Sequence, residues 1–431
     1  MKREKKTDLL KSYLNRHPHY SEFDAIPAND TGLIVVIPVY REREYLFHTL
    51  DALLRCRKPE VAVEVILVFN SSDQDGELVV AEQKATAQLV RERFFCRFPE
   101  WFKPLIIEAY QLPRKHFGAG LARKIGLDAA VSHYAALNNP DGVIVTLDAD
   151  TLVQDNYLQK IRLWFEDDKR NGASLFFEHP VEGDEFPASI YEGIVKYELH
   201  LRYYLLALRS AGFPYAFHTM GSAMAFRALA YARIGGMPRK QAGEDFYFLQ
   251  KLIPLRHFGE INETTVYPSP RPSNRVIFGT GAAITRHAAG EDYVETTYNF
   301  QAFIDLKQFL LLRNELYPLV ADAYESWSYK LSGPMRSFLL NSGFFNDLDI
   351  LKRDCSEEKV FVRRFYEVFN AFRIVKYLNY VHEYFFSKMP VFDAVILLLD
   401  ALGLDVGAII TEQALLQFVR DYGRKNPVYL S

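Results

Sequence analysis

Residues 142–150, GVIVTLDAD, begin as a buried strand and end on two carboxylates. The apolar run suits a central strand of a sheet, where side chains are covered on both faces. Asp148 and Asp150 follow at the point where such a strand leaves for the surface. One Asp there would be explained as the N-cap of the next helix, expected over 156–165. A cap needs one Asp, so the second carboxylate calls for another explanation.

Strand-like and helical segments alternate on the N-terminal side of this stretch. Strands are expected at 32–40, 63–70 and 104–110, and each is followed by a segment of helical periodicity. Strands that alternate with helices predict a Rossmann-like α/β fold, with a mostly parallel sheet and helices on both faces.

The C-terminal half of the chain is more mixed. From about residue 291 the sequence is mainly helical, and the aromatic residues of 361–386 recur at the spacing of one helix face. The aromatic helix around Tyr191 to Leu206 and the C-terminal helices are candidates for an acceptor groove or for plain core. Further segments are expected as a strand at 173–179, helices at 188–212, 223–236 and 243–255, and an extended Pro-rich stretch at 264–281. The expected domains are a helical extension at 1–30, a catalytic domain at 31–290 and a helical domain at 291–431.

Composition limits the classes of function. The chain has 431 residues and a net charge of −3, so no basic field indicates nucleic acid. Cys56, Cys96 and Cys355 match no metal spacing or disulfide framework and suit a reducing compartment. No apolar run reaches the ~18 residues of a spanning helix, so we expect a cytoplasmic protein. Its basic first residues also allow peripheral contact with the inner face of a membrane.

The carboxylate pair indicates a metal–diphosphate site. Side chains two residues apart project to the same side of an extended chain, so Asp148 and Asp150 are expected to face the crevice of the sheet. Two carboxylates that close repel unless a cation joins them. Mg²⁺ or Mn²⁺ accepts one or two carboxylates and takes further ligands from substrate phosphates.

Three other segments carry candidate residues, each with a structural alternative. Pro38, Tyr40 and Glu42 follow the first strand, where a nucleotide could dock, although acidic residues also suit a helix start. Arg123 follows Gly118 and Gly120 and could reach an anion at the helix N-terminus, or lie on a solvated basic face. Glu244 and Asp245 precede a helix, so either could be a cap or could accept a proton from a hydroxyl.

Taken in order, Pro38-Val39-Tyr40, the Gly-x-Gly-x-x-Arg123 helix, Asp148-Ala149-Asp150, Gly235-Gly236 and Glu244-Asp245 resemble the motifs of family 2 glycosyltransferases. The resemblance covers roughly residues 31–280 and implies the GT-A fold. It implies that Asp148 and Asp150 hold Mn²⁺ or Mg²⁺ and the nucleotide-sugar diphosphate. It also implies that Asp245 is the base, with Glu244 nearby, and that Gly221 and Ser222 belong to the wall for donor sugar and acceptor.

One position departs from the family pattern, and the third metal ligand is open. Members often carry an Asp pair after the second strand, where this chain has Phe69-Asn70-Ser71-Ser72. Asn70 could still bind the edge of a uracil or guanine, but the acidic contact is missing. A third metal ligand is often a downstream histidine, and the candidates are His218, His257 and His287.

The sequence therefore predicts a metal-dependent, inverting glycosyltransferase of polysaccharide biosynthesis. It would move sugar from a nucleotide-diphosphate donor to a hydroxyl of a glycan, lipid-linked or small-molecule acceptor. Arg271 and Arg275 would close a loop over the diphosphate and exclude water. The alternatives are a retaining enzyme, a nucleotidyltransferase, and a nucleotide-sugar-binding protein with a degenerate catalytic domain. A nucleotidyltransferase would place a Gly-rich basic loop after the first strand, where this chain has PVYREREY.

Overall fold

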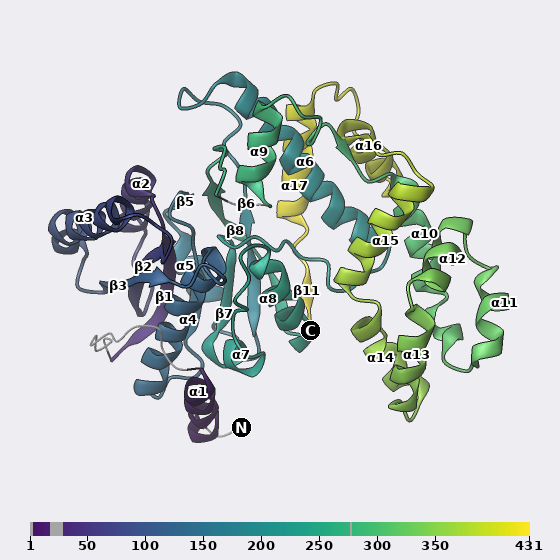
Figure 1. Ribbon diagram of the computed structural model, residues 1–431, viewed down its shortest axis with the longest axis horizontal. Helices are drawn as coiled ribbons and strands as arrows, with labels where there is room; N and C mark the ends of the chain where they lie inside the picture. Colours follow the sequence, from purple (N-terminus) through teal and green to yellow (C-terminus); the bar gives the residue numbers. More distant parts are fainter. Residues whose placement is uncertain (1–2, 18–28, 276–277) are drawn as a thin grey trace. The chain divides into compact units, whose positions relative to one another are not determined.

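The structure is a computed structural model that describes residues 3–17, 29–275 and 278–431 (Figure 1). Within these residues, nine strands form one mixed sheet in the order β11-β8-β6-β7-β4-β1-β2-β3, with β5 paired to β8. Its strands are β1 (Thr31–Val39), β2 (Ala62–Ser72), β3 (Phe102–Leu112), β4 (Val143–Thr146), β5 (Thr151–Val153), β6 (Gly172–Phe177), β7 (Met224–Arg227), β8 (Phe258–Pro268) and β11 (Tyr429–Leu430). A separate ribbon pairs β9 (Thr296–Thr297) with β10 (Met389–Pro390).

Helices follow most of the strands. Up to residue 252 they are α1 (Arg3–Arg16), α2 (Arg43–Leu54), α3 (Glu77–Phe94), α4 (Ala119–Ala136), α5 (Tyr157–Trp164), α6 (Ala188–Ser210), α7 (Ala228–Arg233) and α8 (Glu244–Leu252). Beyond them lie α9 (Thr280–Ala288), α10 (Phe300–Leu311), α11 (Tyr324–Ser328), α12 (Gly333–Asn341), α13 (Phe344–Arg353), α14 (Glu358–Val368), α15 (Ala371–Tyr384), α16 (Val391–Ala401) and α17 (Glu412–Lys425).

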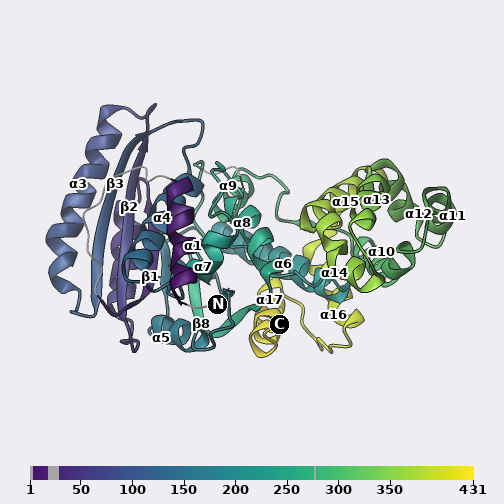
Figure 2. The same cartoon turned by 90° about the horizontal axis from the view of Figure 1, so that it is seen from below.

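The N-terminal part of the sheet is parallel, as the alternation of strands and helices predicted. β3, β2, β1 and β4 pair in parallel, and every residue of β2 and β4 is buried. α3 covers one face of these strands and α4 covers the other (Figure 2). This confirms the α/β fold class with helices on both faces. The carboxyl ends of β1 and β4 lie side by side, where ligands of such sheets bind.

Beyond β4 the sheet becomes mixed. β7 pairs antiparallel with both β4 and β6, while β6 and β8 are parallel. The expected helix at 223–236 is therefore wrong in its first part, because residues 224–227 fill a gap between two buried strands. Tertiary pairing overrides the helix propensity of Ala and Met there. The stretch expected to be irregular from 264 onward likewise continues β8 as far as Pro268.

The chain divides into two compact units. The first comprises residues 1–191, 217–285 and 420–431, and the second comprises 192–216 and 286–419. The boundary expected at residue 290 thus lies near one junction. However, most of α6 belongs to the helical unit, and the last twelve residues return to add β11 to the sheet of the first. Of the helical extension expected at 1–30, residues 1–2 and 18–28 lie outside the described residues.

The second unit is built around aromatic side chains. Phe361, Phe365 and Phe369 are fully buried and contact one another and Phe309. Phe361, Phe365 and Phe369 are therefore core, whereas Tyr384 and Phe385 of the same stripe are exposed. The helix expected at 361–386 is broken at Asn370, whose side chain caps α15 by accepting from the Arg373 amide. None of the helices in the described ranges is long and apolar enough to cross a membrane.

α1 belongs to the first unit and is anchored by a buried polar cluster. Tyr13 is fully buried; its hydroxyl donates to Asp128 Oδ1 at 2.7 Å and accepts from Lys124 Nζ at 2.8 Å. Lys124 also pairs with Asp128 Oδ2 at 2.9 Å. Gly236 has φ +74°, and a Cβ on it would lie 2.1 Å from the Tyr13 hydroxyl. The helix therefore braces both α4 and the Gly235-Gly236 turn.

We expect Tyr13→Phe to lower the free energy of unfolding by about 1–3 kcal/mol, because it removes one partner from two buried polar groups. Chemical denaturation followed by circular dichroism would measure the change. Tyr329→Phe, at a side chain that is 64% exposed, is the matched control and should have almost no effect. A Tyr13→Phe variant as stable as the wild type would contradict the anchoring role.

Candidate active site

Asp148 and Asp150 lie in the turn that follows β4. The strand ends at Thr146, so the expectation that both carboxylates share one face of an extended strand is wrong. Thr151 begins β5 and pairs with Pro268, which brings the loop after β8 to this turn. The two carboxylates therefore meet different partners, one from α4 and one from the loop after β8.

Arg123 joins the turn to the start of α8. Its Nη2 lies 2.6 Å from Asp148 Oδ1, and its Nη1 pairs with Glu244 Oε1. The Arg123 side chain is 3% exposed and that of Glu244 is 7% exposed. Burial alone would lower the pKa of Arg123, but the carboxylates of Asp148 and Glu244 outweigh it and raise that pKa. A fixed, permanently charged guanidinium thus lies between the two acidic motifs.

Glycines make room for this guanidinium. A Cβ on Gly221 would lie 2.7 Å from Arg123 Nη2, and one on Gly120 would lie 2.4 Å from the Lys240 carbonyl oxygen. The Gly221 carbonyl accepts a 2.6 Å hydrogen bond from Thr146 Oγ1. Ser222, next to it, is 2% exposed. Gly221 therefore packs against the Arg123 guanidinium.

Asp245 lies beside this ion pair and, among the residues that the structure describes, forms no ion pair of its own. Its Oδ1 accepts a hydrogen bond of 2.7 Å from the Phe246 amide, at the first turn of α8. Burial, reinforced by the neighbouring charge of Glu244, raises the pKa of Asp245 to about 7. Arg123 neutralises Glu244, which leaves Asp245 as the carboxyl able to exchange a proton near neutral pH.

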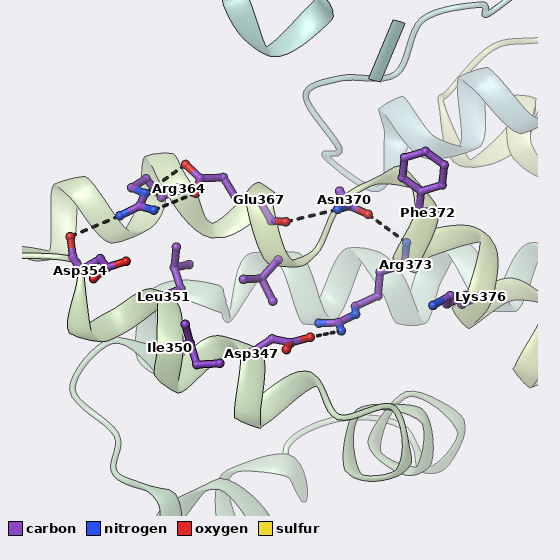
Figure 3. A pocket seen from close by; sticks show the side chains of 11 residues that line it. Asp347, Ile350, Leu351, Asp354, Arg364, Glu367, Asn370, Phe372, Arg373 and Lys376 are labelled. Atoms are coloured by element: carbon purple, nitrogen blue, oxygen red, sulfur yellow. Dashed lines mark hydrogen bonds and ion pairs between the residues drawn. The ribbon is translucent and has the colours of Figure 1, made fainter. Parts of the chain in front are cut away.

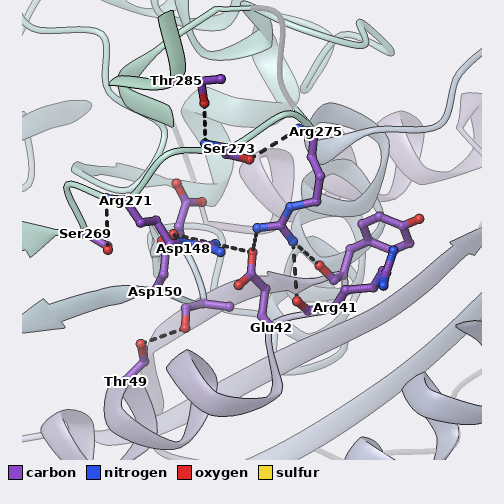
Figure 4. A network of polar contacts seen from close by, with 12 residues as sticks. Arg41, Glu42, Thr49, Asp148, Asp150, Ser269, Arg271, Ser273, Arg275 and Thr285 are labelled. Carbon is purple, nitrogen blue, oxygen red and sulfur yellow. Dashed lines mark hydrogen bonds and ion pairs between the residues drawn. The ribbon is translucent and has the colours of Figure 1, made fainter. Parts of the chain in front are cut away.

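A second network links the turn to the start of α2 (Figure 4). Arg271 Nη2 lies 2.7 Å from Asp150 Oδ2 and 2.5 Å from Glu42 Oε1. Arg275 binds the same Glu42 oxygen at 2.5 Å and donates to the Tyr40 carbonyl. Burial raises the pKa of Glu42, with a further contribution from Asp150. Arg271 and Arg275 were expected to close over a diphosphate, and in this structure both bind carboxylates.

Asn70 and Tyr40 lie at the carboxyl ends of β2 and β1, where the nucleotide is expected to bind, and they have different surroundings. Asn70 is 2% exposed and its amide donates to the Val39 and Val68 carbonyls, so it ties the strand ends together. Tyr40, after β1, donates to Asp75 Oδ1 at 3.0 Å, and the other Asp75 oxygen accepts from the Ser72 amide. Pro38 is part of β1, opposite Val68.

Asp75 is a candidate that the sequence analysis missed. β2 continues to Ser72, and two acids, Asp73 and Asp75, follow it directly. The signal in the sequence was the loop SSDQDG. An acid at this edge can accept from a nucleobase or ribose, which Asn70 in its present position does not offer.

The carboxylates fit a hard divalent cation. Arg123 contacts one oxygen of Asp148 and Arg271 one oxygen of Asp150, which leaves the second oxygen of each for a ligand. Glu42 Oε2 is buried and has no partner among the described residues, so an acceptor beside the pair is unsatisfied. Two protein carboxylates are what Mg²⁺ or Mn²⁺ takes when substrate phosphate supplies the rest.

The three histidines considered as a third ligand lie in other surroundings. The His218 ring packs on Phe177 at 4.9 Å, and His287 lies 3.8 Å from Glu295. His257 precedes β8, at the opposite end from the Asp150 turn and roughly 30 Å away at the usual rise per residue. Across the part of the chain that the structure describes, no three His, Cys, Asp or Glu side chains gather as a metal site.

Comparison with known proteins identifies the class. Residues 34–235 match the family model of glycosyl transferase family 2, a region that includes Arg123 and the Asp148–Asp150 turn and ends before Glu244. The match identifies a glycosyltransferase enzyme. The matched residues are a little less than half of the chain.

Solved structures resemble the chain only loosely, and no curated protein matches its sequence. The structure of S. aureus TarS 1-349 in complex with UDP-GlcNAc is 11% identical, with a TM-score of 0.39, over 78% of this chain and 91% of that one. The mannosyltransferase PcManGT from Pyrobaculum calidifontis, in complex with GDP-Man and Mn2+, is 15% identical, with a TM-score of 0.34, over 98% and 96%. At such scores neither protein's ligands carry over to this chain.

Proposed function

We propose that this glycosyltransferase is metal-dependent and inverting, and that it transfers sugar from a nucleotide-diphosphate donor to an acceptor hydroxyl. The observation that carries the proposal is the group of acids around Arg123. One guanidinium pairs with Asp148, on the donor side, and with Glu244. This pairing leaves Asp245, with a pKa raised to about 7, as the proton acceptor.

Asp148 and Asp150 would hold Mn²⁺ or Mg²⁺ together with the donor diphosphate. The bound metal supplies charge stabilisation for the leaving diphosphate. Arg271 and Arg275, bound to carboxylates in the structure, are close enough to the turn to exchange those partners for phosphate oxygens. Arginine binds either anion in the same bidentate geometry, so the exchange keeps both guanidinium groups paired.

Asp245 would take the proton of the acceptor hydroxyl as its oxygen attacks the anomeric carbon. The new glycosidic bond forms while the bond from that carbon to the diphosphate oxygen breaks, and the nucleoside diphosphate leaves with the electron pair. Glu244 pairs with Arg123 and would hold the start of α8 in place. Gly221, which packs against the Arg123 guanidinium, and the adjacent Ser222 would belong to the wall for donor sugar and acceptor.

The nucleoside would lie over the ends of β1 and β2. Tyr40 and Asp75 are already joined by a hydrogen bond there. Asp75 would accept a hydrogen bond from the base or the ribose of the nucleoside. Asn70 supports this edge from below. The acceptor would be a glycan, a lipid-linked molecule or a small molecule, and the enzyme would act in polysaccharide biosynthesis. It would be cytoplasmic, in contact with the inner face of the membrane. The three free cysteines, Cys56, Cys96 and Cys355, support the reducing compartment.

The test of metal dependence is Asp150→Ala. We expect the variant to lose Mn²⁺-dependent binding of UDP or GDP in calorimetry and to lose donor turnover, because one of the two metal carboxylates is gone. Arg271 keeps Glu42 as a partner, so unfolding should remain cooperative. Asp155→Ala, an exposed acid a few residues along the chain, is the control. Full activity of Asp150→Ala in the presence of a chelator would refute the proposed metal dependence.

A further inference from the structure

A polar groove crosses the second unit, outside the residues that match the family. It lies among α13, α14 and α15 and has a volume of about 430 Å³ (Figure 3). That volume is in the usual range of small-molecule sites, ~300–1,000 Å³. Its residues lie between 347 and 376, so the groove is formed within one compact unit. Nothing in the transfer mechanism uses it.

Ion pairs fix both ends of the groove. At one end Arg373 Nη2 lies 2.5 Å from Asp347 Oδ2. At the other, Arg364 pairs with Glu367 at 2.9 Å and donates to the Asp354 carbonyl. Figure 3 shows Ile350 and Leu351 between these two ends. The polar groups at each end are therefore held in place on helices before any ligand arrives.

Several polar groups in the groove are unused. Arg373 Nη1 is buried and has no hydrogen-bond partner among the described residues. Within the same described set, no ion pair is formed by the Lys376 ammonium or the Asp354 carboxylate. A buried N–H without an acceptor is costly, which makes Arg373 Nη1 a site for an oxygen of a ligand. The free groups comprise both donors and an acceptor.

An apolar strip lies between the polar groups. Ile350 is 59% exposed although it lies beside the nearly buried Leu351. Val368 and Phe372 also line the groove, and the Phe372 ring stands at its rim (Figure 3). A ligand with C–H faces would cover this strip and remove apolar surface from water.

The charges in the groove balance. Arg364, Arg373 and Lys376 face Asp347, Asp354 and Glu367, so there is no excess of positive charge to select a phosphate. A neutral ligand with hydroxyls that both donate and accept, and with C–H faces, matches all of these features. We propose that the groove binds a saccharide, as an accessory site for the glycan acceptor. The role as acceptor site rests on the proposed function, whereas saccharide binding itself does not.

The test uses the full chain and neutral tetrasaccharides as probes: maltotetraose, chitotetraose and mannotetraose. We expect at least one of them to bind in calorimetry and saturation-transfer NMR. Ile350→Arg, which puts a long charged side chain across the strip, and Arg373→Lys, which removes the free Nη1 donor, should each weaken binding by about tenfold or more. Leu397→Arg, at a side chain 47% exposed on α16, is the matched control and should bind as the wild type does.

Three outcomes would overturn the proposal. They are no binding of any probe at millimolar concentration, equal binding by Ile350→Arg and wild type, and binding of inorganic phosphate in place of sugars. Manganese-dependent binding of UDP and GDP to the wild type, measured separately, tests the proposed function. Donor binding without saccharide binding would refute only the groove. Saccharide binding without donor binding would refute only the transfer reaction.

Discussion

Asp245→Asn should lower the rate of sugar transfer by about 10²-fold or more while leaving donor and metal binding intact. Asn keeps the size of Asp and most of its hydrogen bonds but cannot take a proton, and ~10²–10⁴-fold is the usual loss when a general base is removed. Asp148 cannot substitute, because it is bound to Arg123 and lies on the donor side. Transfer kinetics with saturating donor would measure the effect.

Glu244→Gln separates the two adjacent acids. Because Glu244 is paired with Arg123, we expect this variant to be less stable but to keep a working base. If Glu244→Gln is inactive and Asp245→Asn transfers at the wild-type rate, the base is Glu244. If both stay active, the reaction needs no carboxylate base here, and a retaining mechanism becomes the better explanation.

The pH dependence of Asp245 gives the same prediction an independent readout. Its pKa is raised to about 7, so the base is ionised, and transfer is fast, only above that pH. The acid limb of the pH–rate profile should therefore have its midpoint near 7 in the wild type. Asp245→Asn should lose that limb, which a residue with a purely structural role would not remove.

The free energy of unfolding should fall as pH rises, whereas the rate of transfer should increase. Between its ordinary pKa and about 7, Asp245 is protonated in the folded chain and ionised in the unfolded chain, so stability falls as pH rises through this window. The destabilisation is fully present above about pH 7 and absent at acidic pH. Asp245→Asn should thus melt at a higher temperature than the wild type at about pH 8, and at nearly the same temperature at about pH 4.

The sequence predicted well what depends on local pattern. The apolar runs of β1, β2 and β4 and the glycine start of α4 gave the parallel half of the sheet and the positions of Asp148 and Arg123. β7 was missed because Met224–Arg227 has no strand pattern of its own and is extended only by pairing with β4 and β6. Long-range pairing of this kind leaves no signal in a short window.

Ion pairs between residues far apart in the chain could not be predicted from the sequence for the same reason. Arg123 and Glu244 are 121 residues apart, and Arg271 and Glu42 are 229 residues apart. Nothing in either segment indicates its partner, so the roles of Glu244 and Asp245 could not be separated from sequence. Asp75 was a different kind of omission. Its loop was visible, but the end of β2 had been placed too early.

Arg123→Met should lower the free energy of unfolding by about 3–5 kcal/mol, the usual loss when one partner of a buried ion pair is removed. Methionine fills a similar volume, so the loss reflects charge more than packing. Glu244, 6% exposed, would then be a buried carboxylate without a cation, and Asp148 would lose its partner as well. The loss should shrink at acidic pH, because a protonated carboxyl is easier to bury. Denaturant unfolding at two pH values would measure it.

Arg114→Met is the matched control, since the Arg114 side chain is exposed; it should change stability by less than about 0.5 kcal/mol. The decisive measurement is the double variant Arg123→Met/Glu244→Gln. Because glutamine carries no charge to be compensated, it should regain part of the stability that Arg123→Met loses. Arg123 also lowers the pKa of Asp245, so the acid limb of transfer in Arg123→Met should move to higher pH. A double variant no more stable than Arg123→Met would show that Arg123 acts through packing and not through charge.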